Sequence, residues 1–164
     1  MGHSGEFGEI LSREAMRREV GRRQADGQKV VFTNGSFDLL HLGHLTYLKF
    51  ARAQGDCLVV GLNSDASVRR YKDPRRPIVP EAERAAMLAG LRPVDYVVIF
   101  DEDEPRDLIA CLQPDVLVKG EDWAHYVSGR EIVEARGGRV VLAPLVAGRS
   151  TTDIVKKVLA SYRE

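Results

Sequence analysis

Residues 29–44 read KVVFTNGSFDLLHLGH, and this stretch is the most informative in the chain because it joins three local structures. The apolar, largely β-branched run at residues 29–33 predicts a strand buried on both faces. Gly35 then permits a sharp turn and a close backbone approach to a ligand. Gly43 stands where helical periodicity begins, over residues 43–54. The stretch therefore predicts a buried strand, a glycine turn and a helix in direct succession.

The same alternation continues along the chain. Further strands are predicted at residues 57–62, 94–100, 115–118 and 139–143. Further helices are predicted at residues 12–26, 81–91, 104–112, 129–135 and 151–162. Apolar strands alternating with helices are typical of a parallel sheet covered on both sides. We therefore expect an α/β, Rossmann-like, doubly wound parallel sheet of about five strands. Residues 1–11 are expected to form a mobile leader and residues 12–164 a single domain.

Composition limits the classes of function. Lys and Arg total 24, and Asp and Glu also total 24, so the formal net charge is zero. A nucleic-acid scaffold would show a strong basic excess, and no apolar stretch approaches the ~20 residues of a membrane span. The leader lacks the hydrophobic segment of a secretory signal. We expect a cytoplasmic protein that binds neither nucleic acid nor membranes, with Cys57 and Cys111 as reduced thiols.

A ligand site is expected where the strands end, because ligands of open parallel sheets bind beyond the carboxyl ends of the strands. Two of the four histidines, His41 and His44, follow the first buried strand at a helix start. Imidazoles and unpaired helix N–H groups bind oxyanions, which suits a triphosphate. The chain contains neither a Walker loop nor the GxGxxG fingerprint, which disfavours a P-loop kinase and a dinucleotide oxidoreductase.

The motif around these histidines resembles a known family. Gly35-Ser36-Phe37-Asp38 followed by His41-Leu42-Gly43-His44 is similar to the signature of the cytidylyltransferase-like, HxGH-type nucleotidyltransferases. Within that superfamily, residues 29–157 most resemble the adenylyltransferase domain of bacterial ADP-heptose synthases. The matching stretches keep their order along the chain, at residues 32–38, 63–67, 76–84, 117–120 and 150–152. The resemblance implies one nucleotidyltransferase domain at residues 12–164.

The resemblance also implies roles for individual residues. Catalysis is assigned to His41, His44 and Lys72, the last on a mobile, proline-rich loop that ends at Pro80. Nucleotide binding is assigned to Thr33, Asn34, Gly35, Ser36, Phe37, Gly43, Lys119, Gly120, Ser150, Thr151 and Thr152. Sugar-phosphate binding is assigned to Asp38, Asn63, Asp65 and Arg84. No protein metal site is expected, and Mg²⁺ is expected to bind mainly through the substrate phosphates.

The choice of nucleotide follows from a departure near the C-terminus, and the acceptor is implied by the resemblance to ADP-heptose synthases. Residues 145–152, LVAGRSTT, lack the Arg-Thr pair of the Arg-Thr-x-Gly-Ile-Ser-Thr-Thr pattern that cytidylyltransferases carry. We therefore expect AMP transfer from ATP to D-glycero-β-D-manno-heptose 1-phosphate, giving pyrophosphate and ADP-heptose for lipopolysaccharide or another surface glycan. A glycerol-3-phosphate cytidylyltransferase that uses CTP is the alternative, and a catalytically inactive nucleotide-binding module is a further one. The resemblance also implies a homo-oligomer and a separate sugar kinase upstream.

Overall fold

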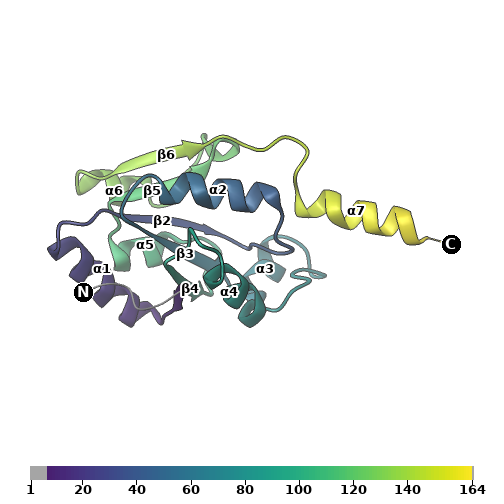
Figure 1. The fold of residues 1–164 in the computed structure, drawn as a ribbon, viewed down its shortest axis with the longest axis horizontal. Coiled ribbons are helices and arrows are strands. Elements are labelled where there is room, and N and C mark those ends of the chain that lie inside the picture. Colours follow the sequence, from purple (N-terminus) through teal and green to yellow (C-terminus); the bar gives the residue numbers. More distant parts are fainter. Residues whose placement is uncertain (1–6, 164) are drawn as a thin grey trace.

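The computed structural model describes residues 7–163 and shows one six-stranded parallel sheet in the order β1-β4-β3-β2-β5-β6 (Figure 1). The strands are β1 (Glu9–Ile10), β2 (Val30–Gly35), β3 (Cys57–Asn63), β4 (Tyr96–Phe100), β5 (Val116–Gly120) and β6 (Arg139–Ala143). The helices are α1 (Arg13–Ala25), α2 (Leu42–Arg52), α3 (Asp65–Tyr71), α4 (Glu81–Ala89), α5 (Arg106–Leu112), α6 (Arg130–Ala135) and α7 (Thr151–Tyr162), with a short 3₁₀ turn η1 (Glu121–Trp123). The predicted α/β class and parallel sheet are confirmed.

The strand β1 corrects the prediction of about five strands. Glu9 and Ile10 pair with Tyr96 and Val97 at one edge of the sheet, inside the segment 1–11 that was predicted to be a mobile leader. Two residues are too few to show a strand periodicity in the sequence. The pairing rests on the backbone, as in the hydrogen bond from Glu9 N to the Asp95 carbonyl at 2.9 Å. Residues 1–6 of the predicted leader lie outside the described residues.

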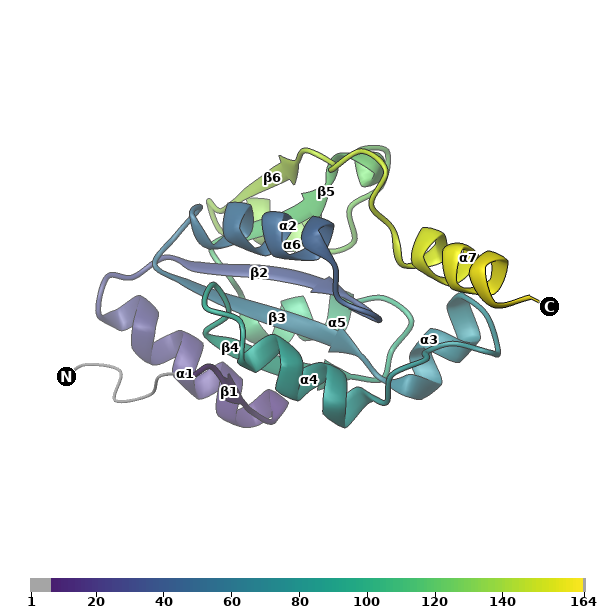
Figure 2. The ribbon, with the colours of Figure 1, turned by 45° about the vertical axis from the view of Figure 1, so that its right-hand side comes forward.

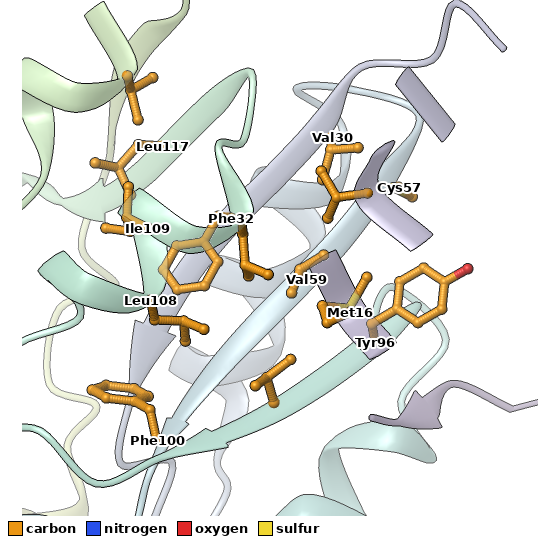
Figure 3. Packing of buried hydrophobic residues seen from close by; sticks show 14 of the residues in the cluster. Met16, Val30, Phe32, Cys57, Val59, Tyr96, Phe100, Leu108, Ile109 and Leu117 are labelled. Atoms are coloured by element: carbon orange, nitrogen blue, oxygen red, sulfur yellow. The ribbon is translucent and has the colours of Figure 1, made fainter. Parts of the chain in front are cut away.

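Alternate side chains of the strands enter two cores, one on each face of the sheet. Along β2, Val30 and Phe32 belong to the core that Leu108 of α5 enters (Figure 3). Val31 belongs to the opposite core, with Leu48 of α2. All five side chains are fully buried, and Figure 2 shows helices on both sides of the sheet. Each fully buried apolar side chain stabilises the fold by ~1.5–3 kcal/mol, so the cores fix the sheet and the loops at its carboxyl edge.

The strand order reverses at β2, which has β3 on one side and β5 on the other. The chain passes from β2 through α2 to β3 and returns later to β5 on the opposite side. In open α/β sheets such a reversal leaves a crevice beyond the carboxyl ends of the strands. Because β2 ends at Gly35 and β5 at Gly120, the loops after these glycines flank the expected ligand site.

Helix α3 was not among the helices predicted from the sequence. Ser64 caps the helix, its hydroxyl accepting the N–H of Ser67 at 3.1 Å. The helix has only seven residues and ends in Arg69-Arg70-Tyr71, so its apolar periodicity is weak. The helix brings Lys72, which follows it, to a fixed position at its C-terminal end.

Helix α7 projects from the body of the domain (Figure 1). None of its residues is buried, and the segment that precedes it returns the chain from β6 to the start of α2. Within residues 7–163, every helix is too short or too polar to cross a membrane.

Candidate active site

His41 and His44 lie at the start of α2 and bond to the helix backbone through the same ring nitrogen. Nδ1 of His41 accepts the N–H of Gly43 at 3.1 Å, and Nδ1 of His44 accepts the N–H of His41 at 3.2 Å. A neutral imidazole whose Nδ1 accepts a hydrogen bond carries its proton on Nε2. The two rings, whose centroids are 3.9 Å apart, therefore each retain an Nε2–H donor. The pair caps the helix and keeps two donors for a ligand.

The surroundings favour the neutral form of both histidines. Burial lowers the pKa of His41, and the charge of Arg149 lowers it further. Burial lowers the pKa of His44 to about 4, with additional contributions from His41 and Lys72. Near pH 7 both rings are therefore neutral, and each can donate a hydrogen bond to an incoming anion. The negative charge of a bound anion would then raise the pKa of both rings.

The loop between β2 and α2 has a backbone that few side chains tolerate. Phe37 and Leu39 have φ angles of 45° and 51°, a region that costs a non-glycine residue about 1–3 kcal/mol. A side chain on Gly43 would approach the His41 ring to 2.8 Å, which explains the glycine of the HxGH motif. The strained turn places the Phe37 ring 5.5 Å from that of His44. Packing against Phe37 therefore helps to set the orientation of this histidine.

Lys72 reaches the loop after β2 from the end of α3. Its ammonium donates to the Ser36 hydroxyl at 2.6 Å, and the residue is the C-cap of α3, at the start of the non-helical segment that runs to Pro80. Burial lowers the pKa of Lys72, and the charges of Arg76 and Arg84 lower it further. Because Lys72 also lowers the pKa of His44, its charge lies close to the imidazole pair. The three predicted catalytic side chains therefore gather beyond the end of β2.

Asp38 is turned into the protein and holds the segment between α3 and α4. Its carboxylate accepts the N–H groups of Ile78 at 2.8 Å and Val79 at 3.0 Å, and it lies 3.6 Å from the Arg76 guanidinium. The residue is buried. Both carboxylate oxygens thus have protein donors, so Asp38 anchors this segment, and its contact with a sugar phosphate stays a prediction.

Arg84 is the most deeply buried charged side chain of the site, only 1% exposed. It donates to the carbonyl oxygens of Ser36 (2.6 Å), Asn63 (2.9 Å) and Val79 (2.8 Å) and to the Asp65 carboxylate (2.8 Å). A guanidinium is a rigid fork of five N–H donors, so it ties the ends of β2 and β3 to the segment before α4. The predicted contact of Arg84 with the sugar phosphate stays a prediction. In this structure Arg84 positions the loops of the site.

The two polar residues at the end of β3 also use their side chains internally. The Asn63 amide donates to the Ser67 hydroxyl at 3.1 Å, and Asp65 pairs with Arg84. Asn63 is 2% exposed. Their predicted contacts with sugar hydroxyls therefore stay predictions, and the geometry shows first that they support α3 and Arg84.

The end of β5 contributes a cation to the crevice. Lys119 donates to the Asn34 side-chain oxygen at 3.2 Å, and its ammonium lies 5.4 Å from the centre of the Trp123 ring. Burial lowers the pKa of Lys119 to about 8. Thr33, by contrast, is fully buried, and its hydroxyl pairs with that of Tyr47 at 2.6 Å. Lys119 and Asn34 thus lie together at the strand ends, whereas Thr33 lies within the domain.

The start of α7 is joined to the loop after β2. The Thr151 hydroxyl donates to the carbonyl of Asp38 at 2.6 Å, and the Ser150 hydroxyl accepts the N–H of Asp153 at 3.0 Å. Thr152 follows on the exposed first turn. The structure therefore brings the predicted Ser-Thr-Thr segment beside the HxGH motif, 110 residues earlier in the chain.

A pocket of about 200 Å³ separates the starts of α2 and α7. His41 lines it from α2, and Arg149, Ser150 and Lys157 line it from the α7 side. The sequence-based assignment missed Arg149 and Lys157, because a basic residue before a capping serine and a lysine on a helix resemble ordinary solvated positions. The available signal was the arginine directly before Ser150-Thr151-Thr152.

Comparisons with known proteins agree with this geometry. Residues 32–157 match the family model described as cytidylyltransferase-like. The chain is 56% identical over 154 residues to bifunctional protein HldE of Citrifermentans bemidjiense, an alignment that covers 93% of this chain and 32% of that protein. It is 53% identical over 163 residues to bifunctional protein HldE of Geobacter metallireducens, covering 99% of this chain and 33% of that protein. The chain therefore spans about a third of the length of these relatives.

Solved structures share the architecture. The lipopolysaccharide core biosynthesis protein from Thermoplasma volcanium superimposes with a TM-score of 0.60 at 29% identity, over 73% of this chain and 98% of that one. Pantoate-beta-alanine ligase from Francisella tularensis superimposes with a TM-score of 0.59 over 90% of this chain and 76% of that one, but at 15% identity it shows likeness of fold alone. The family match spans both the HxGH turn and the start of α7, and it confirms the resemblance inferred from those motifs: the chain belongs to the cytidylyltransferase-like family of nucleotidyltransferases.

Proposed function

We propose that this domain transfers AMP from ATP to D-glycero-β-D-manno-heptose 1-phosphate and so forms ADP-heptose and pyrophosphate. The observation that carries the nucleotidyl transfer is the pair of Nε2–H donors on His41 and His44. The acceptor is supported by the resemblance to ADP-heptose synthases and by the likeness to a lipopolysaccharide core biosynthesis protein. ATP rather than CTP is supported by Leu145-Val146, which stand where cytidylyltransferases carry Arg-Thr.

The reaction requires two anions to meet. An oxygen of the acceptor phosphate attacks the α-phosphorus of ATP, and the bond from that phosphorus to the oxygen bridging the β-phosphate breaks. The bridging oxygen leaves with pyrophosphate. At pH 7 a phosphate monoester already carries a charge of about −1.5 to −2, so its oxygen attacks without a strong base. The protein must therefore align the reactants and stabilise the charge that grows on the leaving group.

The side chains beyond β2 can supply this stabilisation. The Nε2–H groups of His41 and His44 and the ammonium of Lys72 would donate to phosphate oxygens. A nearby phosphate favours the protonated imidazole, so the lowered pKa values of the two histidines would rise as the triphosphate binds. Each ring could then add positive charge to its hydrogen bond. Lys119 would approach the nucleotide from the end of β5.

Mg²⁺ would enter with the triphosphate, neutralising part of its charge and orienting the leaving group. Across residues 7–163, no three His, Cys, Asp or Glu side chains converge to hold a metal ion. Asp153 is the one carboxylate that lines the pocket between α2 and α7. Mg²⁺ takes oxygen ligands and usually keeps several waters beside substrate phosphates. This donor set fits an ion bound mainly through phosphate oxygens.

The cellular setting is part of the proposal. We place the domain in the cytoplasm, where ATP and sugar phosphates are made. A sugar kinase would supply the 1-phosphate, which agrees with relatives that are named bifunctional and of which this chain matches about a third. We also propose a homo-oligomer, on the resemblance alone.

Pyrophosphate release tests the proposal. ATP and CTP would each be incubated with heptose 1-phosphate and with glycerol 3-phosphate in the presence of Mg²⁺, with the His44→Ala variant as the blank. We expect release only with ATP and heptose 1-phosphate. Faster release with CTP and glycerol 3-phosphate would establish the cytidylyltransferase alternative, whereas tight ATP binding with no release in any mixture would indicate an inactive nucleotide-binding module.

A further inference from the structure

Two basic side chains in the pocket between α2 and α7 are free to meet a ligand. Arg149 precedes α7 and Lys157 lies within it, and both line the pocket. Neither side chain forms a hydrogen bond or an ion pair with any of residues 7–163. The other arginines of the site are engaged, Arg84 with Asp65 and Arg76 with Asp38. Among the described residues that line this pocket, Arg149 and Lys157 are therefore the two cations whose side chains have no protein partner.

Arg149 packs directly against the HxGH turn. Its Cβ lies 3.2 Å from the position that a side chain on Gly43 would occupy, and its charge lowers the pKa of His41. The pocket also contains one carboxylate, that of Asp153. With two cations against one anion, and with a neutral His41, the lining has a positive net charge near pH 7.

The position of Arg149 also accounts for a departure in the sequence. The cytidylyltransferase pattern has an arginine three residues before its glycine and an isoleucine directly after it. Here the corresponding residues are Leu145 and Arg149, on either side of Gly148. The segment therefore has its arginine directly after the glycine rather than three residues before it, at a position that lines the pocket together with His41.

We propose that Arg149 and Lys157 bind the β- and γ-phosphates of the donor nucleotide and hold the pyrophosphate before it leaves. The inference rests on the proposed nucleotidyl transfer, in which the HxGH turn receives the triphosphate. A guanidinium matches two phosphate oxygens at once, and a lysine adds a mobile point charge. The two side chains approach from α7, whereas Lys72 approaches from α3. The leaving group would thus be bound between cations from two separate helices.

Binding of inorganic pyrophosphate measures this directly. Isothermal titration calorimetry on the full chain would compare the wild type with Arg149→Gln, Lys157→Gln and Arg149→Lys. Lys156→Gln is the matched control, because Lys156 is the exposed neighbour on the same helix and does not line the pocket. All three substituted side chains are exposed, so the melting temperatures of the four variants should be unchanged, which separates binding from folding.

Hydrogen bonds to charged groups are stronger than those between neutral groups, but exposure to solvent weakens these contacts. We expect the Kd for pyrophosphate to rise about tenfold in Arg149→Gln and in Lys157→Gln, with partial recovery in Arg149→Lys and no change in Lys156→Gln. Raising the salt concentration should weaken the wild type more than either glutamine variant.

Three results would overturn the inference: no pyrophosphate binding by the wild type, unchanged affinity in Arg149→Gln, or an equal loss in Lys156→Gln. If heptose 1-phosphate is not the acceptor, the measurements give a different set of results. In that case pyrophosphate affinity would still fall in the two pocket variants, but the wild type would form no nucleotide sugar from heptose 1-phosphate. The two ideas can therefore fail separately.

Discussion

Replacing Arg84 with methionine tests whether this side chain supports the loops or binds substrate. The substitution keeps most of the side-chain volume but removes four hydrogen bonds, three of them to backbone carbonyls and one to Asp65. Removing one partner of a buried ion pair costs about 3–5 kcal/mol, and each buried acceptor left without a donor costs about 1–3 kcal/mol. Because water can enter the opened site and hydrate the three carbonyl oxygens, we expect the loss to stay near the cost of the broken ion pair alone, about 3–5 kcal/mol.

For a chain of this size, 1 kcal/mol shifts the melting temperature by about 2–4 °C. Differential scanning calorimetry should therefore show Arg84→Met melting roughly 6–20 °C below the wild type. The exposed Arg92 provides the control, since Arg92→Met should change the stability by no more than about 0.5 kcal/mol. An Arg84→Met protein that melts with the wild type, but has a raised KM for the sugar phosphate, would refute the supporting role and favour the predicted substrate contact.

Other consequences concern the histidines and Asp38. His44→Ala should lower kcat/KM for ATP by about 10²–10³-fold, as loss of an oxyanion donor does, with an unchanged circular dichroism spectrum; a loss below tenfold would contradict this role. Because the pKa of His44 is about 4 in the folded protein and near 6.5 in the unfolded chain, the unfolded state takes up the proton first as the pH falls. Stability should therefore decrease between pH 6.5 and pH 4, by at most about 3 kcal/mol and by less where water reaches the ring. Urea titrations at several pH values would measure the free energy of unfolding of the wild type and of His44→Ala. An equal dependence of this free energy on pH in the two proteins would exclude the effect. Asp38→Ala removes the acceptor for the N–H groups of Ile78 and Val79, so trypsin should cut after Arg75 several-fold faster than in the wild type, and equal rates would show that the segment is held by other contacts.

The sheet could be predicted from the sequence because its signal lies in consecutive residues. The runs at residues 29–33 and 57–62 are mostly apolar, and the strands that they predict, β2 and β3, are buried on both faces. Strand β1 and helix α3 could not be recognised in this way. The first is two residues paired through the backbone, and the second is a short helix whose cap, Ser64, is also an ordinary loop residue.

Most of the residues that form the site could be predicted from the sequence, but the role of each residue could be predicted less well. The HxGH motif, Lys72 and the Ser-Thr-Thr segment converge as expected. The sequence shows that Asp38 and Arg84 are polar, but not that their side chains form hydrogen bonds with backbone groups of distant segments. Their partners are backbone groups such as the carbonyls of Ser36 and Asn63. Because every residue has a backbone carbonyl, the sequence does not show which ones accept these hydrogen bonds. Only the fold shows which polar side chains remain open to a ligand.

The central claim is that the α-phosphate of ATP is transferred to a sugar phosphate. The most direct measurement follows ATP labelled at its α-phosphate, incubated with heptose 1-phosphate and Mg²⁺, with the products separated by chromatography. We predict that the label appears in ADP-heptose at a rate equal to pyrophosphate release, and that His44→Ala abolishes both together. Label that stays in ATP, or appears only as free AMP, would contradict the account.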